Sequence, residues 1–338
     1  MQVRAFFEAR PQLQPTPTRH LPALAGRLGL GTLVAKDETA RFGLNAFKLL
    51  GGLFAIETLI AEGAIRPRDT LVCASEGNHG RAVARAARDA GCRSRVYMAG
   101  DAAAARGAAI AGEGAEVVRV AGSYDDAVRI MRAEAADHGW TIVSDTSWDG
   151  YERIPHLIML GYTRMIDEIA DEFDVVFVQG GVGGLLCGVA SACAVLPRRP
   201  SVVCVEPSQA ACLMASARAG HPVAVEGPLN TSMAGLRNRE VSPLAFEAAQ
   251  PIVDAYIAID DAWAHDAMRR FARPEGGDPA IAAGASGSAA LGGLLAVCAE
   301  PSMAPVRERL QLGPTSRVLV VVSEGVTDPQ LQSQVLNA

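Results

Sequence analysis

The stretch VVFVQGGVGGLLCGVASACA, residues 175–194, contains a strand, a glycine-rich loop and a helix in immediate succession. The β-branched run 175–179 has the composition of a strand buried on both faces. The uncharged run after residue 184 has the length and the apolar content of a core helix. Strand, loop and helix in this order form the unit from which parallel sheets with helical crossovers are built.

The same alternation continues on both sides of this stretch. Strands are predicted at 70–74, 95–98, 116–120, 141–143, 201–205, 256–259 and 318–322, and helices at 49–61, 80–89, 124–137, 155–172 and 289–299. A chain of 338 residues is long for one domain, so two doubly wound α/β lobes with mostly parallel sheets are expected. The four strands between residues 70 and 143 form one compact set, and the loop 144–154 is the best boundary.

Composition excludes several classes of partner. The net charge is −6, acidic and basic residues are interspersed, and no basic run reaches five residues, which argues against nucleic acid or an anionic membrane. The uncharged stretches 175–197 and 280–299 are long enough to cross a bilayer, but their Gly, Ser and Gln content favours buried core. Seven cysteines without a CxxC pair, and an N-terminus without a signal-like apolar segment, indicate reduced thiols in a cytoplasmic protein. No metal-ligand spacing is present, so no metal is expected.

Lysine is scarce: of 31 cationic residues only Lys36 and Lys48 are lysine, and the others are arginine. Only an amine can lose its proton and attack a carbonyl, so a retained lysine is a candidate nucleophile. Lys48 ends the segment RFGLNAFK (41–48) and opens an apolar helix, where the helix dipole disfavours a cation and suits a neutral amine or imine. A solvated lysine at a helix start is the alternative interpretation.

Three further segments lie where predicted strands end. SEGNHG (75–80) opens a helix, and its backbone N–H groups can face a carboxylate, although an ordinary turn is the alternative. The glycines at 180–184 can cradle a phosphate. Gly181 and Gly183 with Glu206 also approach a dinucleotide fingerprint, whose third glycine is replaced by Leu186. Ser323, after the strand 318–322, offers a hydroxyl to a ring nitrogen.

Loops at the carboxyl ends of parallel strands build the site in doubly wound folds, so 75–79, 145–151, 180–184 and 323–328 should converge. A lysine amine, a phosphate loop, a carboxylate loop and a hydroxyl are the set of groups that pyridoxal 5′-phosphate (PLP) requires. The sequence therefore predicts a PLP enzyme with a small amino-acid substrate.

The chain resembles the tryptophan-synthase-β-like class, fold type II, of PLP enzymes, and within it the diaminopropionate ammonia-lyases. The resemblance rests on RFGLNAFK (41–48), SEGNHGR (75–81), DTSWDGYERIP (145–155), QGGVGGL (179–185), TSMAGL (231–236) and SEGVTDP (323–329). It implies a smaller domain at 46–154, a larger domain formed by 1–45 and 155–338, and a cofactor between them. It also implies a homodimer.

The resemblance assigns roles to individual residues. Lys48 would hold the cofactor as a Schiff base and carry the substrate's Cα proton, and Glu76 would act as a second base on the other face. Asp145 would be the third catalytic residue and would pair with the β-ammonium of a diamino acid. Cofactor contacts would come from Asn78 (ring oxygen), Gly181, Val182, Gly183 and Gly184 (phosphate) and Ser323 (ring nitrogen), and substrate contacts from Ser75, Gly77, Asn78, His79 and Asp145.

Two positions depart from the family pattern: Glu76 stands where aspartate is usual, and Ala285 where an acid is common. The expected reaction is elimination of ammonia from 2,3-diaminopropionate to give pyruvate. Elimination or replacement on another β-substituted amino acid, such as serine or threonine, is the alternative within the class. Two more distant alternatives are an NAD-dependent dehydrogenase and a non-catalytic protein that binds an amino acid.

Overall fold

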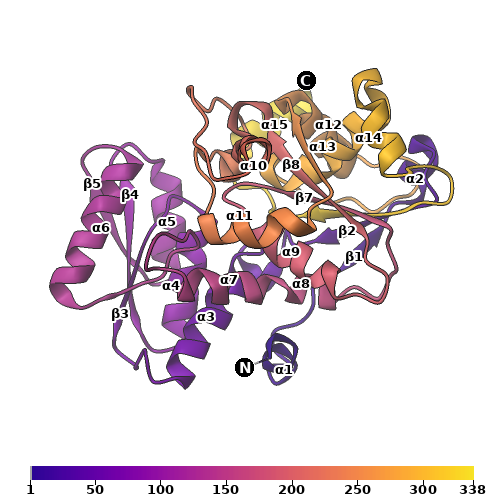
Figure 1. Cartoon of the computed structure of the whole chain (residues 1–338). Coiled ribbons are helices and arrows are strands. Elements are labelled where there is room, and N and C mark those ends of the chain that lie inside the picture. Colours follow the sequence, from indigo (N-terminus) through magenta and orange to yellow (C-terminus); the bar gives the residue numbers. More distant parts are fainter. Residues whose placement is uncertain (1) are drawn as a thin grey trace. The chain divides into compact units, whose positions relative to one another are not determined.

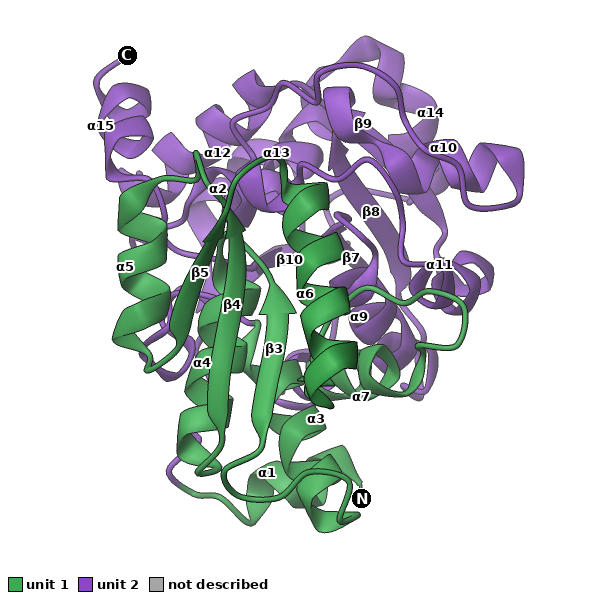
Figure 2. Cartoon of the chain, turned by 90° about the vertical axis from the view of Figure 1, so that its left-hand side faces the viewer, with its two compact units in different colours: residues 1–11, 48–162 green, residues 12–47, 163–338 purple. Residues whose placement is uncertain are grey.

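The structure is a computed structural model that describes residues 2–338, drawn in Figure 1. The chain divides into two compact units, coloured separately in Figure 2: unit 1 comprises residues 1–11 and 48–162, and unit 2 comprises 12–47 and 163–338. Each unit contains its own β-sheet with helices packed on it. The segment up to residue 11 already belongs to unit 1, so Lys48 is the residue at which the chain returns to that unit.

Unit 1 is built on a four-stranded, wholly parallel sheet in the order β5-β4-β3-β6. A helix, α6, covers one face, and its small and apolar side chains Ala127, Met131 and Ala135 pack on the sheet. The strands are β3 (Thr70–Ala74), β4 (Arg93–Ala99), β5 (Glu116–Val120) and β6 (Thr141–Ile142). The helices are α1 (Val3–Glu8), α3 (Leu49–Ala61), α4 (Asn78–Asp89), α5 (Ala104–Gly112), α6 (Tyr124–His138) and α7 (Arg153–Tyr162).

Helices α3 and α7 of unit 1 cross at very short range because glycines face each other across the contact. A Cβ on Gly51 would lie 2.6 Å from the Ile158 carbonyl oxygen, and a Cβ on Gly161 would lie 2.5 Å from the Leu50 carbonyl oxygen. Any side chain at either position would force the helices apart. The crossing fixes the start of α3, which follows Lys48, against the end of α7, which carries Tyr162.

Unit 2 contains a six-stranded sheet in the order β1-β2-β10-β7-β8-β9, with only the β1–β2 pairing antiparallel among its ladders. Strands β7, β8 and β10 are buried along almost their whole length, as the β-branched runs predict. The strands are β1 (Thr18–His20), β2 (Thr32–Asp37), β7 (Val175–Gln179), β8 (Ser201–Pro207), β9 (Ala255–Ile259) and β10 (Arg317–Val322).

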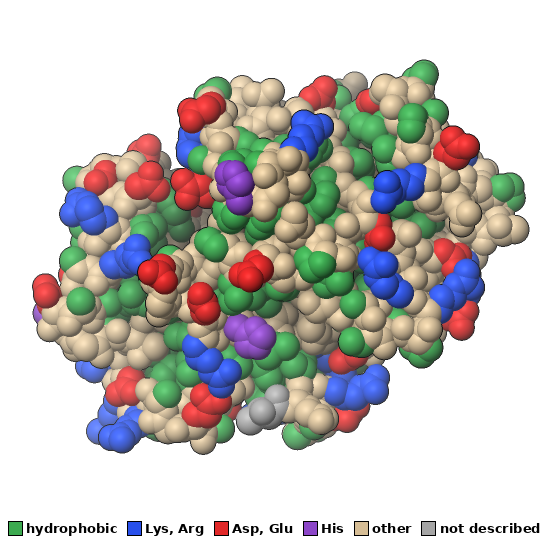
Figure 3. All heavy atoms as spheres, in the orientation of Figure 1, with side chains coloured by type: hydrophobic (Ala, Val, Ile, Leu, Met, Phe, Trp, Pro, Cys, Tyr) green, Lys and Arg blue, Asp and Glu red, His purple; other side chains and the backbone are tan. Residues whose placement is uncertain are grey.

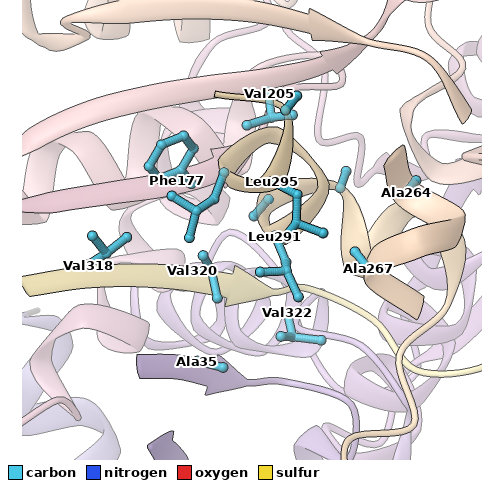
Figure 4. Packing of buried hydrophobic residues seen from close by; sticks show 14 of the residues in the cluster. Ala35, Phe177, Val205, Ala264, Ala267, Leu291, Leu295, Val318, Val320 and Val322 are labelled. Atoms are coloured by element: carbon cyan, nitrogen blue, oxygen red, sulfur yellow. The ribbon is translucent and has the colours of Figure 1, made fainter. Parts of the chain in front are cut away.

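The core of unit 2 forms where one apolar helix, α13, lies against the sheet. Figure 4 shows Leu291 and Leu295 of this helix beside Phe177, Val205 and Val320 of the strands. A glycine, Gly293, lets the helix approach, since a Cβ there would lie 2.7 Å from a Val205 methyl group. The helices are α2 (Pro22–Leu28), α8 (Arg164–Asp167), α9 (Gly184–Ala194), α10 (Cys212–Ala219), α11 (Pro243–Ala249), α12 (Asp261–Ala272), α13 (Ala285–Ala299), α14 (Ala304–Arg309) and α15 (Pro329–Asn337).

The structure corrects the sequence prediction in three places. The single helix predicted over 155–172 is wrong: α7 ends at Tyr162 and α8 begins at Arg164, because the chain passes from unit 1 to unit 2 there. Strands β1 and β2 were not among the predicted strands. The helix predicted from residue 289 begins earlier, at Ala285, since extended Gly284 provides its N-cap.

Several global features are reported for the described residues. On the face in Figure 3, basic and acidic side chains are interspersed without a large area of one sign. All seven cysteines are free thiols. Within residues 2–338 no single helix is both long and apolar enough to cross a bilayer, although the bent pair Ala285–Ala299 and Pro301–Arg309 meets the length and composition test together.

Candidate active site

Lys48 lies at the N-terminus of α3 and pairs with a carboxylate from another loop of unit 1. Its Nζ donates a hydrogen bond to Asp145 Oδ2 at 2.6 Å, and it lies 5.9 Å from the centre of the Tyr162 ring. The Lys48 side chain is 22% exposed, so the amine is accessible to a small molecule. The structure thus brings together two predicted site residues that are 97 positions apart in the sequence.

Asp145 follows β6 and also faces a histidine. Its Oδ2 lies 3.6 Å from His79 Nδ1. Burial acts to raise the pKa of Asp145, but the positive charges that His79 and Lys48 can carry, together with the Lys48 hydrogen bond, outweigh burial and hold that pKa well below its usual range. Asp145 is therefore an ionised carboxylate at neutral pH, suited to bind a cation.

The loop before α4 is shaped by its own side chains. Ser75 Oγ accepts hydrogen bonds from the N–H groups of Gly77 at 3.3 Å and Gly80 at 2.9 Å, which folds the loop over the start of the helix. The helix itself begins at Asn78. The carboxylate of Glu76 accepts a hydrogen bond from the Ala99 N–H at the end of β4, at 3.3 Å. The roles predicted for these residues toward cofactor and substrate stay predictions.

Two tyrosines, Tyr124 and Tyr151, bind backbone groups at the carboxyl ends of β3 and β6. The sequence did not point to Tyr124, and it gave Tyr151 no role. The Tyr124 hydroxyl donates to the carbonyl of Ala74, the last residue of β3, at 3.1 Å. The Tyr151 hydroxyl donates to the Ile142 carbonyl and accepts from the Ser144 N–H, both at 2.9 Å. Tyr124 follows the carboxyl end of β5, so the rule that pointed to the other loops could also have found it.

In unit 2 the glycine loop has the conformation that the sequence predicts. Gly181 and Gly183 have φ of +66° and +103°, in the left-handed region that favours glycine. Helix α9 begins directly after them and no side chain caps its N-terminus. Asn238 lies beside the loop, since a Cβ on Gly181 would be 3.4 Å from its Nδ2. Asn238 belongs to the segment that follows TSMAGL, to which the sequence analysis gave no role.

Ser323 lies at the same edge of the unit 2 sheet as the glycine loop. Gln179, the last residue of β7, donates its side-chain amide to the Val321 carbonyl at 2.8 Å and thereby links the two strand ends. The Ser323 carbonyl accepts the Phe47 N–H at 3.2 Å, and Ala46 forms a β-bridge with Glu324. The segment that leads to Lys48 is thus attached to the strand end that carries Ser323.

Glu206, the acidic residue of the incomplete dinucleotide fingerprint, binds backbone groups of its own unit. Both carboxylate oxygens of Glu206 accept backbone hydrogen bonds at the start of α10, from Leu213 and Met214, each at 2.8 Å. The side chain is fully buried, and burial raises the pKa of Glu206 to about 7. A carboxylate in this position cannot reach a ribose, so the dinucleotide fingerprint loses its second element as well as its third glycine.

Lys36, the other lysine, has no accessible amine. Its Nζ donates to Glu168 Oε2 and to the Thr16 carbonyl, both at 2.7 Å, and its side chain is 0% exposed. Arg41 binds the same Glu168 and also Glu38. We call these residues of unit 2 the buried ion cluster: Thr16, Lys36, Glu38, Arg41 and Glu168. Of the two candidates raised by the lysine count, Lys48 has the partly exposed side chain and Lys36 the buried one, and the role of Lys48 as nucleophile stays a prediction.

Comparison with known proteins assigns this architecture. The model of the family described as "Pyridoxal-phosphate dependent enzyme" matches residues 9–324. The chain belongs to this family. It is 37% identical over 349 residues to a diaminopropionate ammonia-lyase of Escherichia coli strain K12, covering 96% of this chain and 88% of the relative. A protein of the same name from Salmonella typhimurium is 33% identical, covering 99% and 91%.

Solved structures give the same result. The crystal structure of selenomethionine-containing holo diaminopropionate ammonia-lyase from Escherichia coli superposes with a TM-score of 0.91 at 35% identity, covering 99% of this chain and 90% of that chain. The predicted family and the α/β class with mostly parallel sheets are confirmed. The chain is a PLP-dependent enzyme, as its sequence predicts.

The residues present fit PLP on observations in each unit. Unit 2 supplies a glycine loop with two left-handed residues before a helix whose N-terminus lacks a side-chain cap, which suits a phosphate. Unit 1 supplies an accessible lysine amine. Lys48 would bind the cofactor's aldehyde carbon, and the loop Gly181–Gly184 would hold its phosphate. Within the described residues no group of three or more His, Cys, Asp and Glu side chains is placed to hold a metal ion.

Proposed function

We propose that this protein catalyses the elimination of ammonia from 2,3-diaminopropionate, in which diaminopropionate and one water give pyruvate and two ammonia molecules. The observation that carries the proposal is the 2.6 Å pair between Lys48 Nζ and Asp145 Oδ2, which sets an anionic group beside the reactive amine. It is supported by 37% identity, over 96% of the chain, to a protein with this activity in its name.

The chain's own residues divide the work of this reaction. PLP, when bound, supplies the electron sink that makes the substrate's Cα–H bond acidic. Lys48, which would hold the cofactor, supplies the amine that takes the Cα proton. The backbone N–H groups of the Ser75–His79 loop bind the substrate carboxylate, with Gly77 and Asn78 at the start of α4. Gly181–Gly184 would hold the cofactor's phosphate, and Ser323 would offer its hydroxyl to the ring nitrogen.

Asp145 and Glu76 decide the substrate. The ionised Asp145 carboxylate binds the β-ammonium group of diaminopropionate, a group that serine and threonine lack. Glu76, whose carboxylate accepts the Ala99 N–H, acts as the second base on the opposite face of the substrate. With bases on both faces, the D and L enantiomers both react.

The test is pyruvate formation from D- and L-diaminopropionate, each compared with D- and L-serine and L-threonine. We expect both diaminopropionate enantiomers to give pyruvate, with kcat/KM above that of each hydroxy amino acid. Glu76→Gln should reduce turnover of one enantiomer far more than the other, while Glu113→Gln, at the C-terminal end of α5 where Glu113 pairs with Arg81, serves as the control. No pyruvate from either enantiomer would refute the proposal, and a preference for serine or threonine would replace it with the dehydratase alternative.

Other expectations stay predictions. They are the division into a domain at 46–154 and a domain formed by 1–45 and 155–338, one PLP molecule held by residues of both, a homodimer, and a location in the cytoplasm. The amino-acid substrate is supported by the relatives named above, which carry an amino acid in their names.

A further inference from the structure

His79 has one ring nitrogen with a partner and one without. Its Nε2 lies 2.8 Å from the Val143 carbonyl oxygen, which can only accept a hydrogen bond, so Nε2 carries the proton in the neutral ring. Its Nδ1 is buried and, among the described residues, has no hydrogen-bond partner. A buried nitrogen without a partner is costly unless another state of the protein uses it.

The unpartnered nitrogen faces the site. Nδ1 lies 3.6 Å from Asp145 Oδ2, the same oxygen that accepts the 2.6 Å hydrogen bond from Lys48. In the neutral ring, Nδ1 presents a lone pair to a carboxylate, and the contact is repulsive. With a second proton on Nδ1, the same contact becomes a charge-assisted hydrogen bond after a small shift of either side chain.

The other titratable groups around Asp145 cannot supply a positive charge. Cys73, Tyr124, Tyr151 and Tyr162 all have their pKa raised by burial and by the charge of Asp145, so they are neutral at pH 7. Glu76, on the same loop as His79, is an acid. Lys48 and His79 are the cationic groups that act on Asp145.

We propose that His79 is the alternate cation of Asp145: it takes up a proton from solvent at Nδ1 when Lys48 is withdrawn, and releases it when another cation returns. Lys48 is withdrawn whenever its amine is bound to PLP. The returning cation is the β-ammonium of the substrate, a step that rests on the proposed function. His79 is a positioning residue in this scheme, since it keeps Asp145 ionised and in place between turnovers.

The first test uses the full chain without cofactor, so it does not depend on any activity. The ¹⁵N signals of histidine are recorded at pH 7.5 for the wild type, for Lys48→Met and for Lys48→Met/Asp145→Asn, with His79→Gln identifying the His79 signal. We expect a neutral ring with Nε2–H in the wild type. In Lys48→Met the ratio of doubly to singly protonated ring should rise at least about tenfold, as a carboxylate at this distance requires. In the double variant it should return to the wild-type value.

A His79 ring that stays neutral in Lys48→Met, or that is equally protonated in the double variant, would overturn the proposal. If Lys48→Met does not fold, the same signal in wild-type protein before and after PLP addition replaces it, and the added cofactor should raise protonation of His79.

The second test separates positioning from structure. His79→Gln keeps an N–H for the Val143 carbonyl but cannot take up a proton, so the thermal midpoint should stay within a few degrees while kcat/KM for diaminopropionate falls and loses part of its pH dependence. An unchanged pH profile would contradict the proposal. Failure of the proposed function leaves no turnover in any variant but does not change the ¹⁵N result.

Discussion

The two lysines of this chain form ion pairs of nearly equal length in very different surroundings. Lys36 Nζ lies 2.7 Å from Glu168 Oε2, and Lys48 Nζ lies 2.6 Å from Asp145 Oδ2. The first lysine is 0% exposed and the second 22%. Pair distance therefore does not distinguish a structural lysine from a reactive one. The two lysines are distinguished by the exposure of the side chain and by the number of bonds that its carboxylate partner makes.

The charges of the buried ion cluster are paired with one another inside unit 2. Glu168 is bound by Lys36 and Arg41 and, from outside the cluster, by Arg164 at 3.3 Å. Arg41 also binds Glu38 at 2.6 Å. Burial lowers the pKa of Lys36 despite the neighbouring carboxylates. Every charge in the cluster has an opposite charge that cannot leave, so the cluster can hold the turn at Arg41–Gly43 but cannot react. At Asp145, by contrast, Lys48 Nζ and His79 Nδ1 lie 2.6 Å and 3.6 Å from the same oxygen, Oδ2, and the Lys48 side chain is 22% exposed.

Replacing Lys48 should have the largest effect on activity, and replacing Lys36 should have almost none. Lys48→Ala should reduce pyruvate formation by at least about 10³-fold, because the nucleophile and proton carrier is lost, and the yellow colour of a lysine-bound cofactor should disappear. Lys36→Arg keeps the charge in the cluster and should keep the colour. Visible absorbance before and after borohydride, with the pyruvate assay, measures both variants. Colour retained in Lys48→Ala and lost in Lys36→Arg would reverse the assignment.

Opening the cluster should be the next largest effect. Glu168→Ala leaves Lys36 and Arg41 buried without their shared carboxylate and should reduce the free energy of unfolding by about 3–5 kcal/mol. Glu172→Ala, four residues later, removes a carboxylate that binds Arg317 but is 78% exposed, and should cost at most about 1 kcal/mol. Urea unfolding followed by circular dichroism compares the two. Equal losses would show that the buried charges contribute no more than exposed ones.

Much of unit 2 could be predicted from the sequence because its strands are buried on both faces and are consequently continuous β-branched runs, as in VVFVQ (175–179) and the run that ends at Val322. The short edge strand β1, Thr18–His20, has no such pattern, because its residues are half-buried or exposed. The break at Thr163 was also invisible, since it arises from the passage between units and not from a local breaker.

The site was predictable where a loop follows a strand and contains unusual residues, as at 75–80 and 180–184. The pairing of Lys48 with Asp145 was not, because 97 residues separate them, and although both were predicted as catalytic residues no sequence signal links one to the other. Nor could the sequence show that the Glu206 carboxylate accepts backbone hydrogen bonds at the start of α10. Such pairings depend on which strand ends become neighbours. The order of strands in each sheet determines this: β5-β4-β3-β6 in unit 1 and β1-β2-β10-β7-β8-β9 in unit 2.

The buried carboxylate of Glu168 should also make the stability of the fold depend on pH. Burial acts to raise the pKa of Glu168, but the hydrogen bonds and charges of Arg41 and Lys36 outweigh it, and the pKa lies below its usual value. A carboxyl whose pKa is lower in the folded than in the unfolded chain stabilises the fold above the unfolded value, roughly 4, and this stability is lost as pH falls through the folded value. The contribution of Glu168 to the free energy of unfolding should therefore be constant between about pH 7 and 5 and be lost below about pH 4. Glu168→Gln should flatten that fall, whereas an unchanged slope would contradict the argument.

Amine labelling compares the accessibility of the two lysine amines directly, and salt should change the labelling rate only slightly. Because the chain contains two lysines, an acylating reagent followed by peptide mass analysis reports each separately. In the cofactor-free protein Lys48 should be acylated and Lys36 should not until the chain unfolds, since its amine has no exposed surface. Raising the salt from about 0.05 to 1 M weakens a partly exposed ion pair but hardly affects a buried one. The rate at Lys48 should then rise by about twofold while Lys36 stays unlabelled, and parallel labelling of both would mean that the cluster opens as readily as the site.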